Sequence, residues 1–504
     1  MKKYTLNDYA LLLENARLMK VFYSGYADAD QQIEYLTFDS KKVVEGTLFI
    51  CKGAAFKAEY LDEAIAKGAV AYVSEKEYDT KADVPYFIVD DIREAMPLLA
   101  DKFNNHAWDK LNLIGIGGTK GKSTSASYMK AILDDYCFDN GKNETALIST
   151  IDTYDGVVRK ESLLTTPEAV DLQEHFRHAV ESDIEYLQME VSSQALKYGR
   201  VAHTKFTVGI FLNISEDHIS PIEHPDFEDY FSSKLRMFKQ CKYAVINKDA
   251  DFAQRVIDAA ASCEKVLTYS ITDETADIYG YHIEKDGNET VFRVRTAEFD
   301  EEFRLGMPGI FNVENALSVI GAAMLLQIPM KYIKSGLERA RTSGRMELYT
   351  SKDNQKIAIV DFAHNKLSFE KLISSTREEY PDYKVVIVFG SPGSKANIRR
   401  KHLGEVAAEM ADQIYLTADD PAYETVIDIC NEIAGFIGDK CPYTIIEDRR
   451  EAIQTAIEQS EGKTVILVAG KGNEAWLKYE NKKVPCKSDV ENVKEFLAKY
   501  DQSK

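Results

Sequence analysis

Residues 111–124 read LNLIGIGGTKGKST, an apolar run that leads into clustered glycines and ends on a lysine and two hydroxyl residues. A helical pattern of apolar residues follows, so the order is strand, glycine turn and helix. Such a turn aims backbone N–H groups at an anion, and the helix N-terminus adds its partial positive charge. The spacing is the short G-x-x-G-K-S form, because Ile116 stands where the longer motif has glycine.

This stretch predicts a cradle for the phosphates of ATP. The Lys122 ammonium is placed to reach the terminal phosphates, and the Ser123 hydroxyl is placed to ligate magnesium. The residues expected to hold the nucleotide in this loop are Gly118, Thr119, Lys120, Gly121, Lys122, Ser123 and Thr124.

Length and charge limit the classes of protein to consider. A chain of 504 residues is too long for one core, so we expect about two to four domains. The formal net charge of −20 disfavours nucleic acid and anionic membranes as partners. No apolar run approaches the roughly 20 residues needed to span a bilayer. An anionic substrate therefore needs a local basic pocket that works against the charge of the whole chain.

Cysteine usage and the N-terminus indicate a reducing compartment. The seven cysteines have no paired spacing, which argues against both disulfides and structural zinc. Residues 1–5, MKKYT, lack the apolar stretch of a signal peptide. We therefore expect a cytoplasmic protein.

Alternating strand-like and helical stretches predict an α/β fold with doubly wound, mostly parallel sheets. A helical stretch at 60–67 lies between the first two expected strands. The expected buried strands are 46–50, 69–73, 186–191, 207–213, 243–247, 357–361, 384–390, 413–417 and 464–469.

Two of these strands end in groups that suit phosphate chemistry. Glu190 and Ser192 lie at the end of the strand at 186–191, and His218 follows the strand at 207–213. Ligands of open α/β sheets sit at the carboxyl ends of the strands, and a carboxylate there is a hard-oxygen ligand for magnesium. The plainer interpretations remain open, namely Ser192 as a helix N-cap and His218 as a structural residue.

Two threonines precede the next expected helix. Thr165 and Thr166 stand directly before Pro167, which is typical of a turn or a helix start. Their hydroxyls suit substrate oxygens equally well, so both interpretations remain open.

Together these motifs resemble the Mur ligases, ATP-dependent enzymes that extend the peptide stem of the cell-wall precursor, and within them the tripeptide-synthesising branch. The resemblance runs from Phe38 to Asp489, nearly the whole chain. The strings that carry it are Asp39-Ser40, Thr165-Thr166-Pro167-Glu168, Glu190-Val191-Ser192-Ser193, Gly199-Arg200, Asn213, Asp217-His218, Ser233-Lys234-Leu235, Phe311-Asn312-Val313-Glu314-Asn315, Gly344-Arg345-Met346-Glu347, Asp361-Phe362-Ala363-His364 and Gly470-Lys471-Gly472-Asn473-Glu474.

The resemblance implies three domains: a UDP-substrate-binding domain at 1–108, a central ATP-binding domain at 109–340, and a Rossmann-like, amino-acid-binding domain at 341–504. It implies an ATP-dependent peptide ligase of peptidoglycan precursor synthesis. In that family ATP phosphorylates a substrate carboxylate, and an amino acid's amine then attacks the acyl phosphate. The substrates implied are UDP-N-acetylmuramoyl-L-alanyl-D-glutamate and an amino acid.

The resemblance also assigns the catalytic groups, Lys122, Glu190, His218 and Lys234. Two magnesium ions are implied, held by Ser123, Glu190 and His218. Family precedent makes Lys234 a carbamate, formed when a neutral amine captures carbon dioxide, and its anionic oxygens would serve the second ion. Alone, a lysine in this context is typical of a solvated helix residue. Cations at this place would let the two anionic substrates approach each other.

Further roles follow by matching single positions. The nucleotide contacts implied are Asn312 and Arg345, with Asp361 on the ribose and His364 near the phosphates. Ser40 is assigned to the uridine diphosphate end. The muramoyl-dipeptide contacts implied are Thr165, Thr166, Ser192 and Arg200. Each residue also has a structural interpretation as a cap, a turn residue or a surface charge.

The added amino acid is predicted from residues 419–422, Asp-Asp-Pro-Ala. Family members that use diaminopimelate carry arginine at the position of Ala422, where it grips the distal carboxylate. Without that grip the carboxylate would be buried without a partner, which strongly disfavours diaminopimelate. Asp419 and Glu474 offer negative charge suited to an ammonium group. We therefore expect L-lysine, with ornithine or a related amine second.

Several loops depart from the family pattern. Lys120 replaces asparagine, Asn365-Lys366 replaces Thr-Pro, and Asn473 replaces histidine. These departures leave open a divergent paralogue that joins a different amino acid to a different carboxylate. A catalytically silent nucleotide-binding partner also remains open, as does a plain ATPase or kinase. We expect a monomer with small-molecule partners.

Overall fold

The computed structural model describes residues 2–25, 30–53, 56–80, 83–216, 219–220, 223–286, 289–307, 309–341, 344, 346–394, 398–480 and 482–504. The chain forms two compact units, Met1–Tyr269 with Ser318–Gly336, and Ser270–Leu317 with Leu337–Lys504.

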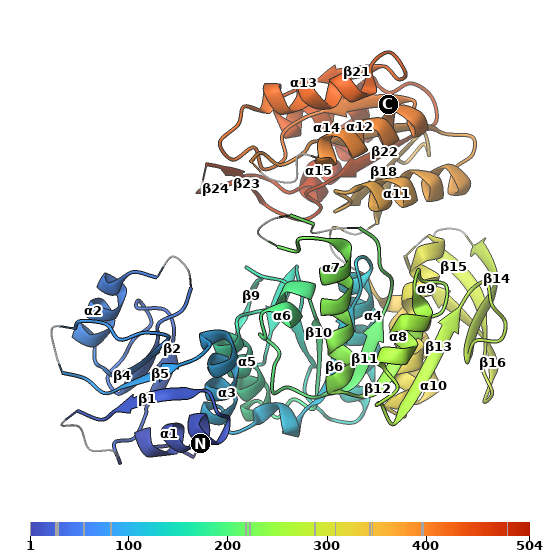
Figure 1. The fold of residues 1–504 in the computed structure, drawn as a ribbon. Helices are drawn as coiled ribbons and strands as arrows, with labels where there is room; N and C mark the ends of the chain where they lie inside the picture. Colours follow the sequence, from blue (N-terminus) through green and yellow to red (C-terminus); the bar gives the residue numbers. More distant parts are fainter. Residues whose placement is uncertain are drawn as a thin grey trace. The chain divides into compact units, whose positions relative to one another are not determined.

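The first unit begins with a five-stranded sheet of order β1-β5-β4-β3-β2 (Figure 1). Strand β1 is antiparallel to β5, and the other pairs are parallel. Side chains alternate between the faces, so Leu48 and Ile50 pack toward α1 and α3 while Phe49 packs toward α2. The elements are α1 Leu6–Asn15, β1 Met19–Tyr23, β2 Tyr35–Thr37, β3 Thr47–Ile50, α2 Ala58–Ala66, β4 Ala69–Ser74, β5 Tyr86–Val89 and α3 Ile92–Phe103.

A larger sheet follows in the same unit, with the strand order β13-β12-β11-β6-β10-β7-β8-β9. Its strands from β13 to β7 lie parallel, and β8 and β9 add an antiparallel edge. The strands are β6 Asn112–Gly117, β7 Ala146–Ile148, β8 Asp152–Tyr154, β9 Arg159–Glu161, β10 Tyr186–Glu190, β11 Phe206–Phe211, β12 Cys241–Asn247 and β13 Lys265–Ser270.

Helices cover this sheet. Apolar residues of α5, α6 and α7 pack on one face, where Leu172, Leu196 and Phe231 join Leu187 and Met189 of the central strand β10. The helices are η1 Ala107–Lys110, α4 Lys122–Asp139, α5 Ala169–Glu181, α6 Ser193–Lys197, α7 Phe227–Leu235, η2 Arg236–Gln240, α8 Ala253–Ala259, α9 Ile310–Leu325 and α10 Met330–Arg339. Of these, α9 and α10 continue into the second unit.

The second unit contains an antiparallel meander, β14 Ile278–Asp286, β15 Glu289–Arg295 and β16 Asp300–Leu305. It also contains a six-stranded sheet of order β17-β18-β22-β19-β20-β21, parallel except for β17. Its remaining elements are β17 Glu347–Thr350, β18 Lys356–Asp361, α11 Lys366–Glu379, β19 Lys384–Phe389, α12 Ile398–Met410, β20 Gln413–Leu416, α13 Val426–Ile437, β21 Tyr443–Ile445, α14 Arg449–Gln459, β22 Thr464–Ala469, β23 Trp476–Tyr479, β24 Lys482–Pro485 and α15 Asp489–Ser503.

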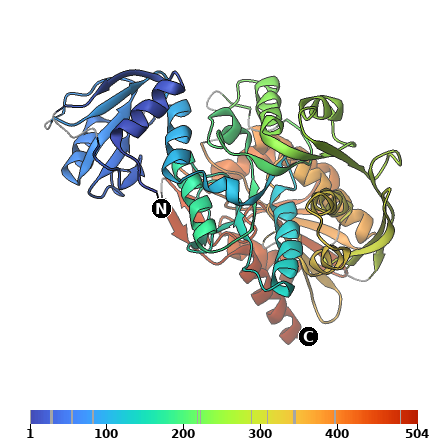
Figure 2. The ribbon, with the colours of Figure 1, turned by 90° about the horizontal axis from the view of Figure 1, so that it is seen from below.

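The core of the six-stranded sheet follows the same alternation. Val386 and Val388 of β19 pack with Ile453 of α14 and Phe496 of α15, so these two helices share one face. On α11, the Phe369 ring makes an edge-to-face contact with Phe389 at 4.9 Å. Figure 2 shows these helices and sheets turned by 90°.

The predicted α/β fold is confirmed, and the expected buried strands form with shifts of one or two residues at their ends. Within the described residues, no helix has both the length and the hydropathy that a bilayer span requires. The seven cysteines are all free thiols, and five of them are buried.

Candidate active site

The loop between β6 and α4 is shaped by two glycines. Gly118 has a φ of +146° and Gly121 a φ of +83°, a region that L side chains rarely adopt. A Cβ atom at Gly118 would also lie 2.9 Å from the Cβ of Leu212, too close for two carbon atoms. Helix α4 begins at Lys122, so the loop delivers the chain directly into a helix N-terminus, as the sequence predicts.

A side-chain amide holds this loop against the end of β11. The Lys120 N–H donates to Asn213 Oδ1 at 2.8 Å, and Asn213 Nδ2 donates to the Lys120 carbonyl at 3.2 Å. The Thr119 N–H donates to the Asn213 carbonyl at 3.0 Å. The hydroxyls of Thr119 and Tyr230 lie 2.9 Å apart, which ties the loop to α7. The hydrogen bonds with the Asn213 amide therefore involve only main-chain atoms of Lys120.

Two lysine ammonium groups meet at one backbone oxygen in this loop. Lys122 Nζ donates to the Gly118 carbonyl at 3.0 Å, and Lys234 Nζ donates to the same oxygen at 2.8 Å. Lys122 also donates to the Thr119 carbonyl at 3.0 Å. Lys234 is 4% exposed and lies 4.7 Å from the centre of the Tyr230 ring. Positive charge is thus concentrated at the mouth of the phosphate loop.

Glu190 supplies a buried carboxylate beside the same loop. It is 1% exposed and accepts hydrogen bonds from the Ser123 hydroxyl at 2.8 Å and from the Thr150 N–H and hydroxyl at 2.8 and 3.0 Å. These donors are all neutral, so none of them offsets the negative charge of a carboxylate. The Ser123 and Glu190 oxygens are the hard donors that magnesium prefers, and they lie within contact distance of one another.

The four residues predicted to bind the muramoyl-dipeptide are also brought to this edge of the sheet. Thr166 Oγ1 donates to the Glu190 carbonyl at 2.9 Å and accepts from the Ser192 N–H at 3.0 Å. The hydroxyl oxygens of Thr165 and Thr150 lie 3.1 Å apart. Arg200 donates to the Thr166 carbonyl at 3.2 Å.

The Arg200 guanidinium lies 2.9 Å from Glu168, which also pairs with Lys52 at 2.5 Å. Lys52 follows β3 of the N-terminal sheet, so this ion pair connects that sheet to the N-terminus of α5. Ser192 caps α6, accepting from the Ala195 N–H at 3.2 Å, as the plainer interpretation of that residue predicts. Capping leaves the substrate role of Ser192 as a prediction.

Ser40, predicted to contact the uridine diphosphate end, lies after β2 and is largely buried. Its hydroxyl donates to Glu63 at 2.7 Å, and Lys67 donates to the Ser40 carbonyl at 3.0 Å. Hydrogen bonds from Lys67 and from Ser40 lower the pKa of Glu63. The Ser40 hydroxyl and carbonyl are therefore both engaged within the N-terminal sheet.

Three contacts at the site were not predicted from the sequence. Thr150 contacts both Glu190 oxygens, but it follows a strand of three residues that carries little pattern. The Tyr230 hydroxyl lies beside Thr119. His224 is fully buried and lies 3.0 Å from the Ser193 hydroxyl and 2.6 Å from Asp229. The helix spacing of Tyr230 and Lys234, four residues apart, was a usable signal that Tyr230 lies beside Lys234, but it does not predict the contact with Thr119.

In the second unit, charged groups gather at the carboxyl ends of β20 and β22. Lys471 is 2% exposed, donates to Asp420 at 2.8 Å and forms an ion pair with Glu474. Burial raises the pKa of Asp419, although Lys471 and Arg449 act in the opposite direction. Burial likewise raises the pKa of Glu474, and Lys471 opposes it. Asp419 and Glu474, predicted to bind the amino acid, thus lie around a lysine of the chain itself.

The remaining predicted nucleotide contacts lie in the same unit. Asn312 is fully buried in the first turn of α9. Asp361 ends β18 and accepts from the Met346 N–H at 2.9 Å. His364 Nδ1 lies 2.7 Å from the Phe362 carbonyl. The predicted residues His218 and Arg345 fall outside the described residues.

Two family models match the chain. Residues 116–323 match the Mur ligase middle domain, and residues 344–472 match the glutamate ligase domain of Mur ligases. The first match contains the phosphate loop with Glu190 and Lys234, and the second contains the Asp420–Lys471 pair.

Curated relatives match over nearly the whole chain. A protein of Streptococcus pneumoniae serotype 4 named UDP-N-acetylmuramoyl-L-alanyl-D-glutamate–L-lysine ligase is 38% identical over 467 residues, 92% of each chain. A UDP-N-acetylmuramyl-tripeptide synthetase of Lactobacillus delbrueckii subsp. bulgaricus is 36% identical over 99% of each chain. Among solved structures, a UDP-N-acetylmuramoyl-L-alanyl-D-glutamate–2,6-diaminopimelate ligase has a TM-score of 0.68 at 23% identity, covering 99% of each chain, which shows a shared fold.

Proposed function

Because this chain belongs to the Mur ligase family, we propose that it is an ATP-dependent ligase that joins L-lysine to UDP-N-acetylmuramoyl-L-alanyl-D-glutamate in peptidoglycan precursor synthesis. One observation carries the proposal. The Nζ atoms of Lys122 and Lys234 both contact the Gly118 carbonyl, beside a buried Ser123–Glu190 pair. The relatives named as lysine ligases and tripeptide synthetases support the choice of reaction.

The arrangement suits the formation of an acyl phosphate. A substrate carboxylate and a triphosphate repel each other, so a site that brings them together must supply cations. Lys122 supplies one cation at the phosphate loop. Ser123 and Glu190, together with His218, would hold magnesium, which supplies further neutralisation of charge when bound. The amine of the amino acid then attacks the activated carbonyl carbon, and phosphate leaves.

We propose that Lys234 carries a carbamate in the active enzyme. Its Nζ is buried and lies 2.8 Å from the Gly118 carbonyl. A carbamate keeps one N–H, so it can retain this hydrogen bond while presenting anionic oxygens. Lys234→Ala should abolish activity, and short-chain carboxylates should restore part of it. A fully active variant would contradict the assignment.

The remaining roles follow the three-domain division proposed from the sequence, at 1–108, 109–340 and 341–504. Ser40 contacts the uridine diphosphate end, and Thr165, Thr166, Ser192 and Arg200 contact the muramoyl-dipeptide. Asn312, Arg345 and Asp361 contact the nucleotide. The net charge of −20 supports small-molecule partners rather than nucleic acid or anionic membrane. We place the reaction in the cytoplasm and expect a monomer.

Lysine is favoured over diaminopimelate by the groups after β20. Ala422 has no charge with which to bind a distal carboxylate, whereas Asp419 and Glu474, together with Asp420, are acidic. Lys471 already neutralises part of this charge, so an incoming ammonium would share these carboxylates with Lys471. A second carboxylate in that place would meet net negative charge without a bidentate donor.

A panel of substrates tests the proposal. Phosphate release would be measured with ATP, magnesium and UDP-N-acetylmuramoyl-L-alanyl-D-glutamate, with lysine, ornithine or diaminopimelate added in turn. We expect release that depends on both the acceptor and the amine, and that is fastest with lysine. A preference for diaminopimelate would overturn the choice of amino acid. Turnover only with another acceptor would indicate a divergent paralogue, and nucleotide binding without turnover would indicate a silent partner.

A further inference from the structure

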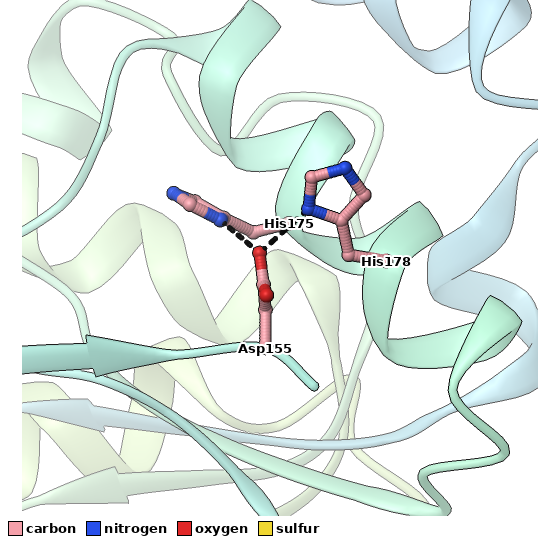
Figure 3. A group of neighbouring side chains, drawn as sticks. All are labelled: Asp155, His175 and His178. Atoms are coloured by element: carbon pink, nitrogen blue, oxygen red, sulfur yellow. Dashed lines mark hydrogen bonds and ion pairs between the residues drawn. The ribbon is translucent and has the colours of Figure 1, made fainter. Parts of the chain in front are cut away.

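A second group of polar side chains lies apart from the phosphate loop, between the edge of the large sheet and α5 (Figure 3). Asp155 directly follows β8, while His175 and His178 stand three residues apart on α5. Both imidazoles turn their Nδ1 atoms toward one carboxylate oxygen, Asp155 Oδ2, at 2.6 and 2.8 Å. The three ligand-type atoms lie within 4.8 Å of one another.

The carboxylate is held rigidly in this orientation. Its other oxygen accepts from the backbone N–H groups of Val157 and Val158 at 2.9 and 2.6 Å. The Asp155 side chain is fully buried, His175 nearly so, and His178 is 16% exposed. Burial raises the pKa of Asp155, but the hydrogen bonds from His175 and His178 outweigh burial and hold that pKa below its ordinary range. The group therefore places an anionic carboxylate and two imidazoles around one point, with access from the side of His178.

We propose that Asp155, His175 and His178 form a binding site for a divalent transition-metal ion, with Zn²⁺ as the best-suited ion. Two imidazoles and one carboxylate are a donor set that zinc binds with a fourth position open to water. Imidazoles that bind a metal are neutral, so the Asp155 carboxylate is the only formal charge of this donor set, and a divalent cation offsets it.

The distances allow the ion after a small adjustment. Zinc–nitrogen and zinc–oxygen bonds of about 2.0–2.1 Å at tetrahedral angles place neighbouring ligand atoms about 3.3 Å apart. The present separations of 2.6 and 2.8 Å are those of hydrogen bonds, so each histidine must move away from Asp155 Oδ2 by about 0.5–0.7 Å. The backbone N–H groups on Asp155 Oδ1 would stay in place and act as the outer support of the site.

Metal binding also changes the hydrogen atoms carried by the imidazoles. Each Nδ1 now donates to a carboxylate and so carries a hydrogen, which must move to Nε2 when Nδ1 binds a metal. His178 Nε2 lies 3.4 Å from the Arg177 guanidinium, and both would then be donors. Arg177 forms ion pairs with Glu174 and Glu181 at 3.2 and 2.9 Å, and these can remain when the 3.4 Å contact with His178 is lost.

A second aspartate–histidine pair in the chain can serve as a control, because it lacks a second histidine. His106 Nδ1 lies 2.8 Å from Asp101 Oδ2, the same contact that Asp155 makes with each histidine. The other partner of that carboxylate is the Trp108 indole N–H at 2.9 Å, which cannot bind a metal. This pair should bind zinc poorly, because one imidazole and one carboxylate make an incomplete set.

The test uses the full chain after removal of metal by a chelator, with excess Mg²⁺ present to fill sites of hard oxygen ligands. Zn²⁺ alone would be titrated by calorimetry, and Co²⁺ would report ligand type and geometry through its visible spectrum. We expect one zinc per chain and a raised Tm. In His178→Gln the affinity should fall at least tenfold, while His106→Gln should bind as the wild type does.

Asp155→Asn should lose the site as well, and circular dichroism would check that this variant folds. His178→Gln provides the milder change, because His178 lies at the exposed side of the group. Equal zinc affinity in the wild type and His178→Gln would overturn the proposal, as would the absence of any Co²⁺ spectrum in the wild-type chain. A thiolate charge-transfer band would place the metal on a cysteine and would also overturn it.

Discussion

The phosphate loop and the charged cluster after β20 and β22 lie at the same kind of place, the carboxyl ends of parallel strands, but the described contacts of their lysines differ. At the phosphate loop, Glu190 accepts from neutral donors, and the lysine heads of Lys122 and Lys234 are held on a backbone carbonyl. In the cluster, Lys471 is already paired with Asp420 and Glu474. Among the described contacts, the first region therefore places its lysines on a backbone carbonyl, and the second pairs its lysine with two carboxylates.

This difference indicates different tasks. Lysine side chains and a carboxylate placed together at a phosphate loop suit ligands that carry large charge, such as a triphosphate and magnesium. Charges paired within the protein stabilise the fold locally and present a smaller net charge, which suits a zwitterionic amino acid. Substitutions should therefore affect mainly the rate in the first region and mainly stability in the second.

Removing a cation from the phosphate loop should give the largest effect. Lys122→Met should lower kcat by about 10³-fold, equivalent to about 4 kcal/mol of transition-state stabilisation, because the charge that faces the phosphates is lost. The free energy of unfolding should change little. Steady-state phosphate release and urea unfolding measure the two quantities, with the exposed Lys110→Met as the control. A Lys122→Met variant with wild-type kcat would contradict the prediction that substitutions in the phosphate loop act mainly on the rate.

Removing the cation of the cluster should affect stability first. Lys471→Met leaves Asp420 and Glu474 without their buried counter-charge, and we expect the free energy of unfolding to fall by about 3 kcal/mol. Urea unfolding measures this loss. The double variant Lys471→Met/Glu474→Gln should recover part of the lost free energy of unfolding, because it also removes one of the two carboxylates that no longer have a counter-charge. Unchanged stability in the single variant would mean that the pairing is not what stabilises this region.

Backbone strain gives a smaller effect of opposite sign in the two regions. The phosphate loop places glycine at positive φ, whereas the loop after β20 places Ala422 there, at a φ of +53°. Gly121→Ala should lower the free energy of unfolding by about 1 kcal/mol, and Ala422→Gly should raise it by up to about 1 kcal/mol. Chemical denaturation of both variants tests this pair, and a change of the same sign in both would contradict it.

The smallest effect is a pH dependence confined to the cluster. Burial raises the pKa of Asp419 in the folded chain, so folding favours its protonated form. Asp419 therefore contributes its whole stabilisation of the folded chain at pH values below its ordinary pKa of 3.8. This contribution is lost as the pH rises through the higher pKa that Asp419 has in the folded chain. The wild type should therefore lose stability relative to Asp419→Asn as pH rises within that window. Parallel unfolding curves of the two proteins at every pH would contradict the assignment.

Local signals in the sequence were sufficient for much of the fold. The phosphate loop, its strand and α4 are contiguous, so residues 111–124 predict them without knowledge of distant contacts. Buried parallel strands such as β18 and β22 are continuous apolar runs that are easily recognised. The edge strands β8 and β9 are short and partly exposed, so they carry no comparable pattern.

The site was predictable only where a motif placed its residues. Glu190 was predicted because it ends a buried strand, but its partner Thr150 lies 40 residues earlier and depends on the pairing of β7 with β10. The contact of Asp155 with two histidines on α5 spans at least 20 residues and likewise exists only in the folded chain. Long-range pairing of this kind leaves no periodicity in the sequence.

The two hydrogen bonds between the Asn213 amide and residue 120 bear on which substitutions this loop tolerates. Because Asn213 binds the N–H and carbonyl of residue 120, the loop is shaped through main-chain atoms that every amino acid other than proline provides. The presence of lysine at position 120 is therefore compatible with these two hydrogen bonds. The side chain at position 120 can thus change while these two hydrogen bonds persist, whereas replacement of Asn213 by alanine would remove both.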